Sequence, residues 1–107
     1  MEINVRDPSS TLVAARNDLG KIVGALTLTV YRVPTGIRSI IEDVIVDNSA
    51  RGQGIGEALV KHAIRVARER GAGNISLTCN PMREAANRLY QRMGFKKRET
   101  NAYQILL

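Results

Sequence analysis

The sequence has little with which to build disulfides or metal sites. Among its 107 residues there is one cysteine, Cys79, and one histidine, His62. A lone cysteine forms no disulfide within the chain, which suits the reducing cytoplasm. No cluster of histidines and cysteines supports a metal site. We therefore expect a cytoplasmic protein with no metal.

Long apolar runs and aromatic residues are also scarce. No run approaches the ~18 apolar residues of a membrane span, and the opening MEINVRDPSS lacks the apolar segment of a signal peptide. There is no tryptophan, and the four aromatic residues are Tyr31, Tyr90, Phe95 and Tyr103. The sequence thus predicts no membrane contact. Few aromatics and no nucleic-acid motif also argue against binding to nucleic acid.

Positive charge is what the chain has in excess. Sixteen lysines and arginines stand against ten acidic residues, a net charge of +6. Such a balance favours an anionic partner, among them a phosphorylated cofactor, although a solubilising surface explains it equally well. The length predicts a single domain over 1–107, and the apolar fraction of 44% is that of a globular protein.

The order of apolar and polar residues predicts a mixed α+β fold. Alternating and β-branched runs predict strands, and apolar residues at helical spacing predict helices. In chain order we expect strands at 11–16, 22–33 and 39–47, a helix at 56–70, a strand at 74–79, a helix from Asn80-Pro81 to about Met93, and strands at 95–99 and 103–106. Residues 1–10 form an N-terminal arm, in which Met1 to Val5 suit a short strand.

This order of elements also predicts how the sheet is connected. The first three strands follow one another through tight turns, which is typical of an antiparallel meander. A crossover through the first helix places strand 39–47 parallel to strand 74–79. The result is a mostly antiparallel mixed sheet with a central parallel pair and helices packed on it.

A glycine-rich turn, RGQGIG at residues 51–56, separates the third strand from the first helix. Free N–H groups and the dipole at a helix N-terminus attract anions, and glycines let a phosphate approach the backbone. Glu57 and Ala58 follow Gly56 where a nucleotide-hydrolase loop needs Lys and Ser/Thr, and Glu57 also breaks the dinucleotide fingerprint G-x-G-x-x-G. The remaining interpretations are another phosphate site or a turn that is only structural.

The pattern Arg51-x-x-Gly54-x-Gly56 resembles the acetyl-CoA motif of the GNAT superfamily of N-acetyltransferases. A later stretch, AANRLYQRMGF, resembles a second motif of that family at Leu89-Tyr90 and Gly94-Phe95. The resemblance covers about residues 11–106. It implies transfer of an acetyl group from acetyl-CoA to an amine, with the cofactor held by Val44, Ile45, Val46, Arg51, Gly52, Gln53, Gly54, Ile55, Gly56, Asn87 and Tyr90.

The chemistry of acetyl transfer assigns further roles. The parallel strands should separate at 44–47 and 76–79, and a backbone N–H of Ile45 or Val46 should face the thioester oxygen. Glu42 or Asp43 would accept the amine proton; alternation separates the two, and we favour Glu42. Both carboxylates have the alternative of being solvated strand-end groups.

Tyr90 matches the family's usual general acid, which would protonate the leaving thiolate; its alternative is a core tyrosine. Asn87 contacts the cofactor arm or is a solvated helix residue.

One part of the family pattern is not found in the sequence. Members usually have a strand and one or two helices before the strand that is here 11–16, and these form much of the acceptor site. Only MEINVRDPSS stands there. We expect one of three outcomes: a minimal enzyme, a homodimer that rebuilds the missing wall, or a CoA-binding module with little or no catalysis. The acceptor amine cannot be identified from the sequence.

Overall fold

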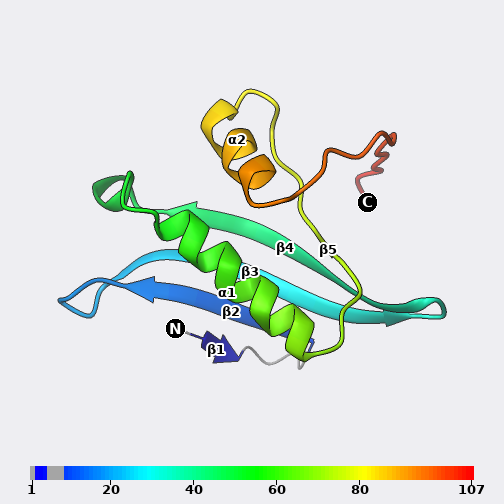
Figure 1. Ribbon diagram of the computed structural model, residues 1–107, viewed down its shortest axis with the longest axis horizontal. Helices are drawn as coiled ribbons and strands as arrows, with labels where there is room; N and C mark the ends of the chain where they lie inside the picture. The colour runs from blue at the N-terminus through cyan, green and yellow to red at the C-terminus, as the bar shows by residue number, and fades with distance from the viewer. Residues whose placement is uncertain (1, 5–8) are drawn as a thin grey trace.

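The computed structural model describes residues 2–4 and 9–107, with side chains described from residue 9 onward. Its elements are β1 (Glu2–Asn4), β2 (Ser10–Arg16), β3 (Ile22–Val33), β4 (Gly36–Val46), a short 3-10 helix η1 (Asn48–Ala50), α1 (Ile55–Glu69), β5 (Ile75–Ser76) and α2 (Glu84–Arg92). Figure 1 shows α1 lying along the sheet and α2 beside it.

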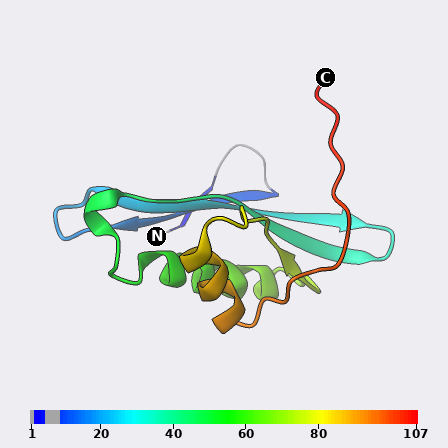
Figure 2. The ribbon, with the colours of Figure 1, turned by 90° about the horizontal axis from the view of Figure 1, so that it is seen from above.

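The five strands form one sheet in the order β1-β2-β3-β4-β5. Neighbours are antiparallel except β4 and β5, which are parallel and joined through α1. Both helices lie on the same side of the sheet (Figure 2). The predicted α+β class, the meander and the parallel pair are thereby confirmed. The pair lies at the edge of the sheet rather than at its centre, because no described strand follows β5 in the order.

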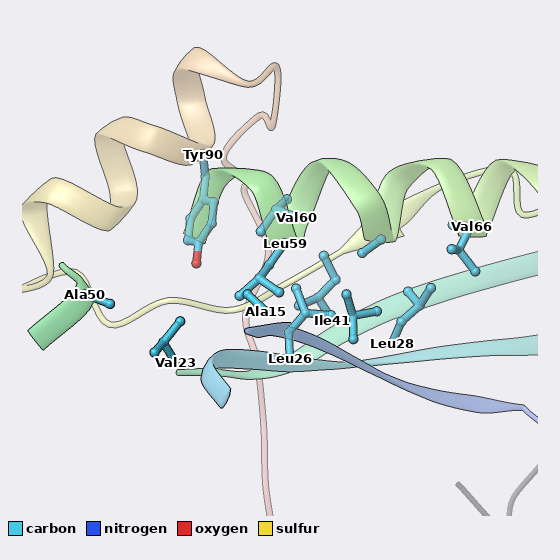
Figure 3. Packing of buried hydrophobic residues seen from close by; sticks show 13 residues of the cluster. Ala15, Val23, Leu26, Leu28, Ile41, Ala50, Leu59, Val60, Val66 and Tyr90 are labelled. Atoms are coloured by element: carbon cyan, nitrogen blue, oxygen red, sulfur yellow. The ribbon is translucent and has the colours of Figure 1, made fainter. Parts of the chain in front are cut away.

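The core lies between α1 and the middle of the sheet. The helix buries Leu59, Val60, Ala63, Val66 and Ala67, which recur at helical spacing. They face buried side chains of the strands, among them Leu26, Leu28 and Ile41 (Figure 3). Each such Leu or Val stabilises the fold by about 1.5–3 kcal/mol, so this stripe fixes α1 against the sheet.

A β-bulge interrupts β4 near its end. Thr27 pairs with Glu42, but Ala25 pairs with Ile45, so Leu26 faces two residues, Asp43 and Val44. Among the described residues other than glycine, Asp43 alone has a positive φ, of 57°. A bulge bends its strand and breaks the alternation of side chains, and this one lies on the strand that approaches the glycine-rich turn.

Several predicted boundaries differ from the structure. Of the strand expected at Met1 to Val5, Glu2–Asn4 is confirmed, and the two end residues lie outside the described part. The strand expected at 74–79 is only Ile75–Ser76. The second helix begins at Glu84 rather than Pro81, because Asn80 closes a separate turn: its side chain accepts the N–H of Met82 (2.9 Å) and its carbonyl that of Arg83 (3.0 Å).

The prediction of strands at 95–99 and 103–106 is wrong. Residues 95–107 form no strand. A strand needs a neighbour to receive its backbone hydrogen bonds, and Figure 2 shows this segment leaving the body of the protein and ending beyond the sheet, on the side opposite the helices. Within the described part of the chain, neither helix is long and apolar enough to cross a membrane.

Candidate active site

The glycine-rich turn leaves the N-terminus of α1 open. Gly52 and Gly54 have φ of 82° and 75°, a conformation that side chains disfavour, so these two glycines set the path of the turn. Gly54 is the N-cap of α1, and no side chain caps the helix. The first N–H groups of α1 therefore remain available to an anion.

Gly56, the third glycine of the RGQGIG turn, is small for a different reason. Gly56 is helical, and a Cβ there would lie 3.8 Å from Cγ2 of Val46, an ordinary contact. Neither backbone strain nor crowding demands glycine at this position. This is compatible with close approach of a ligand to the first turn of α1.

Gly24, on β3, lets the start of α1 approach the sheet closely. Its role was not predicted from the sequence. A Cβ on Gly24 would lie 2.9 Å from Cγ2 of Ile55 and 3.1 Å from Cδ1 of Leu59. The backbone carbonyl of Ile45 would be 3.3 Å away. The first turn of α1 packs directly on the backbone of β3, and this close packing leaves no room for a Cβ at Gly24. A glycine inside a strand pattern was the one signal for such a close approach.

A cleft opens where β4 and β5 stop pairing. The last paired residues are Ile40 and Ser76. Separation on β4 therefore begins before the predicted 44–47, whereas on the other strand Ser76, the first residue of the predicted 76–79, is still paired. The cleft has a volume of about 300 Å³. Its lining comes from β4, from the segment after β5 and from α2 with its N-cap: Ile41, Glu42, Asp43, Val44, Leu77, Thr78, Arg83 and Tyr90.

Both candidate bases, Glu42 and Asp43, line this cleft and are exposed. The expectation that strand alternation separates them is wrong, because the bulge inserts Asp43 into the strand with a left-handed backbone. Two consecutive acidic residues thus line the same cleft.

Tyr90 closes the other wall. It is 7% exposed and its ring meets that of Phe95 edge to face, with centroids 5.9 Å apart. The backbone N–H of Phe95 also donates to the carbonyl of Tyr90 (2.9 Å). The second sequence motif therefore has a packing role: the glycine between them, Gly94, turns the chain at a φ of 100° and brings Phe95 back onto Tyr90.

The hydroxyl of Tyr90 points away from α2 toward the sheet (Figure 3). Burial raises the pKa of Tyr90 above its ordinary value of 10.0, and the negative charge of a Cys79 thiolate raises it further; the guanidinium of Arg83 lowers it. The phenol is therefore protonated at neutral pH and is able to donate a proton in the cleft.

The segment that leads from β5 into α2 is held by Asn87. Its amide nitrogen donates to the carbonyls of Asn80 (3.0 Å) and Arg83 (2.8 Å). These bonds fix the N-cap of α2, and with it the position of Arg83 in the cleft wall. Sequence reasoning missed Arg83, because its position depends on the turn that Asn80 closes.

The predicted cofactor residues do not all lie in the cleft. Gln53 and Ile55 line a second cavity of about 340 Å³, formed with the β2–β3 hairpin and η1. Arg51, Gly52 and Gly54 are exposed on the turn, Ile45 is 64% exposed, and Val46 lies near Gly56. The end of β4 thus connects the cleft to the turn.

Comparison with known proteins gives a consistent picture. A model of the family described as acetyltransferase (GNAT) family matches residues 2–95. The crystal structure of a transcriptional regulator from Bacillus halodurans C-125 aligns with a TM-score of 0.84 and 37% identity, covering 95% of this chain and 69% of that one.

Two curated relatives are enzymes by name. Streptothricin acetyltransferase of Streptomyces lavendulae is 47% identical over 58 residues, which are 54% of this chain and 31% of that protein. Glucosamine 6-phosphate N-acetyltransferase of Trypanosoma brucei brucei is 33% identical over 92 residues, 83% of this chain and 60% of that protein. The chain therefore spans less than two thirds of the length of either relative.

Proposed function

Because the chain belongs to the acetyltransferase (GNAT) family, we propose that it transfers an acetyl group from acetyl-CoA to a primary amine, by direct attack within a ternary complex. The observation that supports the proposal is the cleft between β4 and β5, whose lining includes two acidic residues, Glu42 and Asp43, and the buried Tyr90. At the end of the same strand, β4, the chain enters a turn that leaves a helix N-terminus open to an anion.

The glycine-rich turn fits the pyrophosphate of acetyl-CoA. The first N–H groups of α1 point at the turn without a side-chain cap, and the helix dipole favours negative charge there. Arg51 is exposed on the same turn and adds a positive charge. Glu57, in the first turn of α1, forms an ion pair with Lys61 at 3.9 Å. This ion pair partly neutralises the charge of Glu57, which would otherwise repel the phosphates.

Bound acetyl-CoA supplies the thioester, and the end of β4 supplies a donor for its oxygen. The N–H of Asp47 donates to the carbonyl of Val23 on β3 (2.8 Å). Successive N–H groups of a strand alternate in direction. The N–H of Ile45 therefore faces β3, and that of Val46 faces the open side. Of the two donors considered from the sequence, we favour Val46 to stabilise the developing negative charge.

Proton transfer uses the two walls of the cleft. Glu42 or Asp43, both exposed to water there, accepts the proton of the attacking amine, directly or through a water. Tyr90 holds a proton on the facing wall and gives it to the thiolate as the carbon–sulfur bond breaks. Because its pKa is raised above the ordinary 10.0, Tyr90 holds its proton at neutral pH.

The acceptor that we propose is a primary amine carried by a small polar molecule. The names of two relatives point to acceptors of this kind, streptothricin and glucosamine 6-phosphate. The two acidic residues that line the cleft favour the approach of a cationic amine.

The test of the proposed function has two stages. In the first, acetyl-CoA is added to the full chain and the melting temperature is measured; binding to the folded state should raise it. In the second, release of free CoA thiol is followed across a panel of amines. Failure of millimolar acetyl-CoA to raise the melting temperature would refute the proposal. A raised melting temperature without thiol release would instead indicate that the protein binds CoA with little or no catalysis.

Tyr90→Phe sharpens the second stage. The variant removes one oxygen and keeps the ring against Phe95, so the fold should persist. We expect kcat to fall by about 10²–10⁴ while the stabilisation by acetyl-CoA is retained. Tyr31→Phe is the matched control, since Tyr31 is 40% exposed and is not among the residues that line the cleft. Equal activity in the two variants would exclude Tyr90 as the acid.

A further inference from the structure

Arg83 lines the cleft, and none of the proton transfers proposed for the cleft uses it. It is the one positively charged residue among those that line the cleft in the described part of the chain. Glu42 and Asp43 are the other charged residues of the lining, and both are acidic. A single cation in a lining that also holds two acidic residues and a tyrosine is a candidate for a part in the chemistry.

The backbone of Arg83 is held firmly, whereas its side chain is not paired. Its N–H donates to the carbonyl of Asn80 (3.0 Å), and its carbonyl accepts the backbone N–H (3.0 Å) and the side-chain amide (2.8 Å) of Asn87. Within the described chain the exposed guanidinium forms no hydrogen bond or ion pair. Arg88 on the same helix differs, because it pairs with Glu84 at 4.0 Å. The charge of Arg83 is therefore available to the cleft.

The geometry of α2 directs Tyr90 toward the end of the helix that carries Arg83. Arg83 is the N-cap, and Tyr90 follows about two helical turns later, so both reach the same cleft. Side chains of a helix lean toward its N-terminus. Burial, the largest effect, and a Cys79 thiolate both raise the pKa of Tyr90, whereas the guanidinium of Arg83 lowers it. Arg83 thus favours the ionised form of this phenol.

We propose that Arg83 is a positioning residue for the acid step, in which its guanidinium stabilises the negative charge that proton transfer leaves on Tyr90. This role rests on the acetyl transfer proposed above. As the carbon–sulfur bond of the tetrahedral intermediate breaks, its electron pair goes to sulfur. The proton on Oη of Tyr90 moves to that sulfur, which gives the CoA thiol and a phenolate. The phenolate then takes a proton from water, and Tyr90 is restored.

The other groups around Tyr90 all disfavour a phenolate, which is why a cation matters there. Burial removes water that would solvate the charge. Cys79, in the segment after β5, repels it when ionised. Glu42 and Asp43, from β4, line the same cleft and add negative charge. Arg83 is the one group of the lining with the opposite effect, so it lets a cleft built to attract an amine also release an anion.

The first test measures the pKa of Tyr90 and needs no turnover. Isotope-labelled tyrosine is followed by nuclear magnetic resonance as the pH rises, with Tyr90→Phe to assign the signal. Arg83→Gln should raise the pKa of Tyr90, because it removes the cation that lowers it, and Arg83→Lys should return it toward the wild-type value. Arg88→Gln is the matched control: Arg88 is on the same helix but does not line the cleft. An unchanged pKa in Arg83→Gln, or equal shifts in the two glutamine variants, would overturn the proposal.

The second test follows thiol release with an amine that the protein accepts. Arg83→Gln should lower kcat roughly tenfold and leave the KM values for acetyl-CoA and the amine nearly unchanged, and Arg83→Lys should recover most of the loss. Because the substitution raises the pKa of Tyr90, the alkaline decline of kcat should move to higher pH. In a Tyr90→Phe background Arg83→Gln should have little further effect, since Arg83 acts through the phenol.

The kinetic outcomes separate this role from others. A loss confined to KM would mean that Arg83 binds a ligand directly, and the proposal would be wrong. Full additivity with Tyr90→Phe would mean that Arg83 acts independently of the phenol, which also contradicts the proposal. The titration distinguishes these failures from failure of the proposed function: a shifted pKa in Arg83→Gln, with no thiol release from any variant, would refute acetyl transfer and not the effect of Arg83 on Tyr90.

Discussion

Gly24→Ala tests the close packing of α1 on β3, which positions the glycine-rich turn. The new Cβ would lie 2.9 Å from Cγ2 of Ile55 and 3.3 Å from the carbonyl oxygen of Ile45. Rotation about χ1 would move Cγ2, but a helix holds a β-branched side chain in one strongly preferred rotamer. The carbonyl belongs to the backbone of β4 and moves only with that strand. We expect α1 to shift at its first turn.

The expected cost follows from two opposing effects. Overpacking of a tight contact costs about 1–3 kcal/mol. Replacing glycine by alanine in a strand also restricts the unfolded chain, which stabilises the fold by about 0.4–1 kcal/mol. The middle of the two ranges gives a net destabilisation of about 1.3 kcal/mol. Because Ile55 begins α1, the displacement should also weaken binding of acetyl-CoA and reduce the rise in melting temperature that it causes.

The assay is urea unfolding with and without acetyl-CoA. Gly73→Ala is the matched control: its Cβ would lie 3.7 Å from the nearest atom, an ordinary contact, and we expect a change within about 0.5 kcal/mol. If the clash with Ile55 is the cause, the double variant with Ile55→Ala should be more stable than the two single effects predict, by about 0.5–2 kcal/mol. A neutral or stabilising Gly24→Ala would refute the argument.

Three further predictions concern the turn, the acid and the loop. Gly54→Ala should destabilise the fold by about 1–2 kcal/mol, because φ is 75° there, whereas Gly56→Ala should leave urea unfolding nearly unchanged; equal losses would show that the two glycines share one role. The pKa of Tyr90 is raised on folding, so its contribution to stability is complete below pH 10.0 and is lost as the pH rises through the folded value; thermal unfolding should show an alkaline loss that Tyr90→Phe lacks. Asn87→Ala, which removes bonds of 2.8 and 3.0 Å, should cost about 1 kcal/mol and raise KM; an unchanged melting temperature would contradict its role in holding the loop.

Local patterns in the sequence were sufficient for most elements. The alternation of β-branched residues predicted β3 at Ile22–Val33, and the spacing of Leu59, Ala63 and Val66 predicted α1. These patterns suffice because a strand or helix that packs on one face repeats its apolar residues at its own period. The glycine motif and the tyrosine motif indicated the family for the same reason: each is a short run whose geometry is local.

Features that depend on distant parts of the chain were decided only by the tertiary structure. The bulge that brings Asp43 beside Glu42 arises from the register between β3 and β4, and Gly24 matters because α1 packs on it from thirty residues away in sequence. The segments 95–99 and 103–106 were expected as strands but pair with no strand among the described residues. The sequence by itself determined which segments suit a strand, a helix or an anion-binding turn. Only tertiary structure decided which backbone groups meet, because pairing and close contact join residues that no local pattern relates.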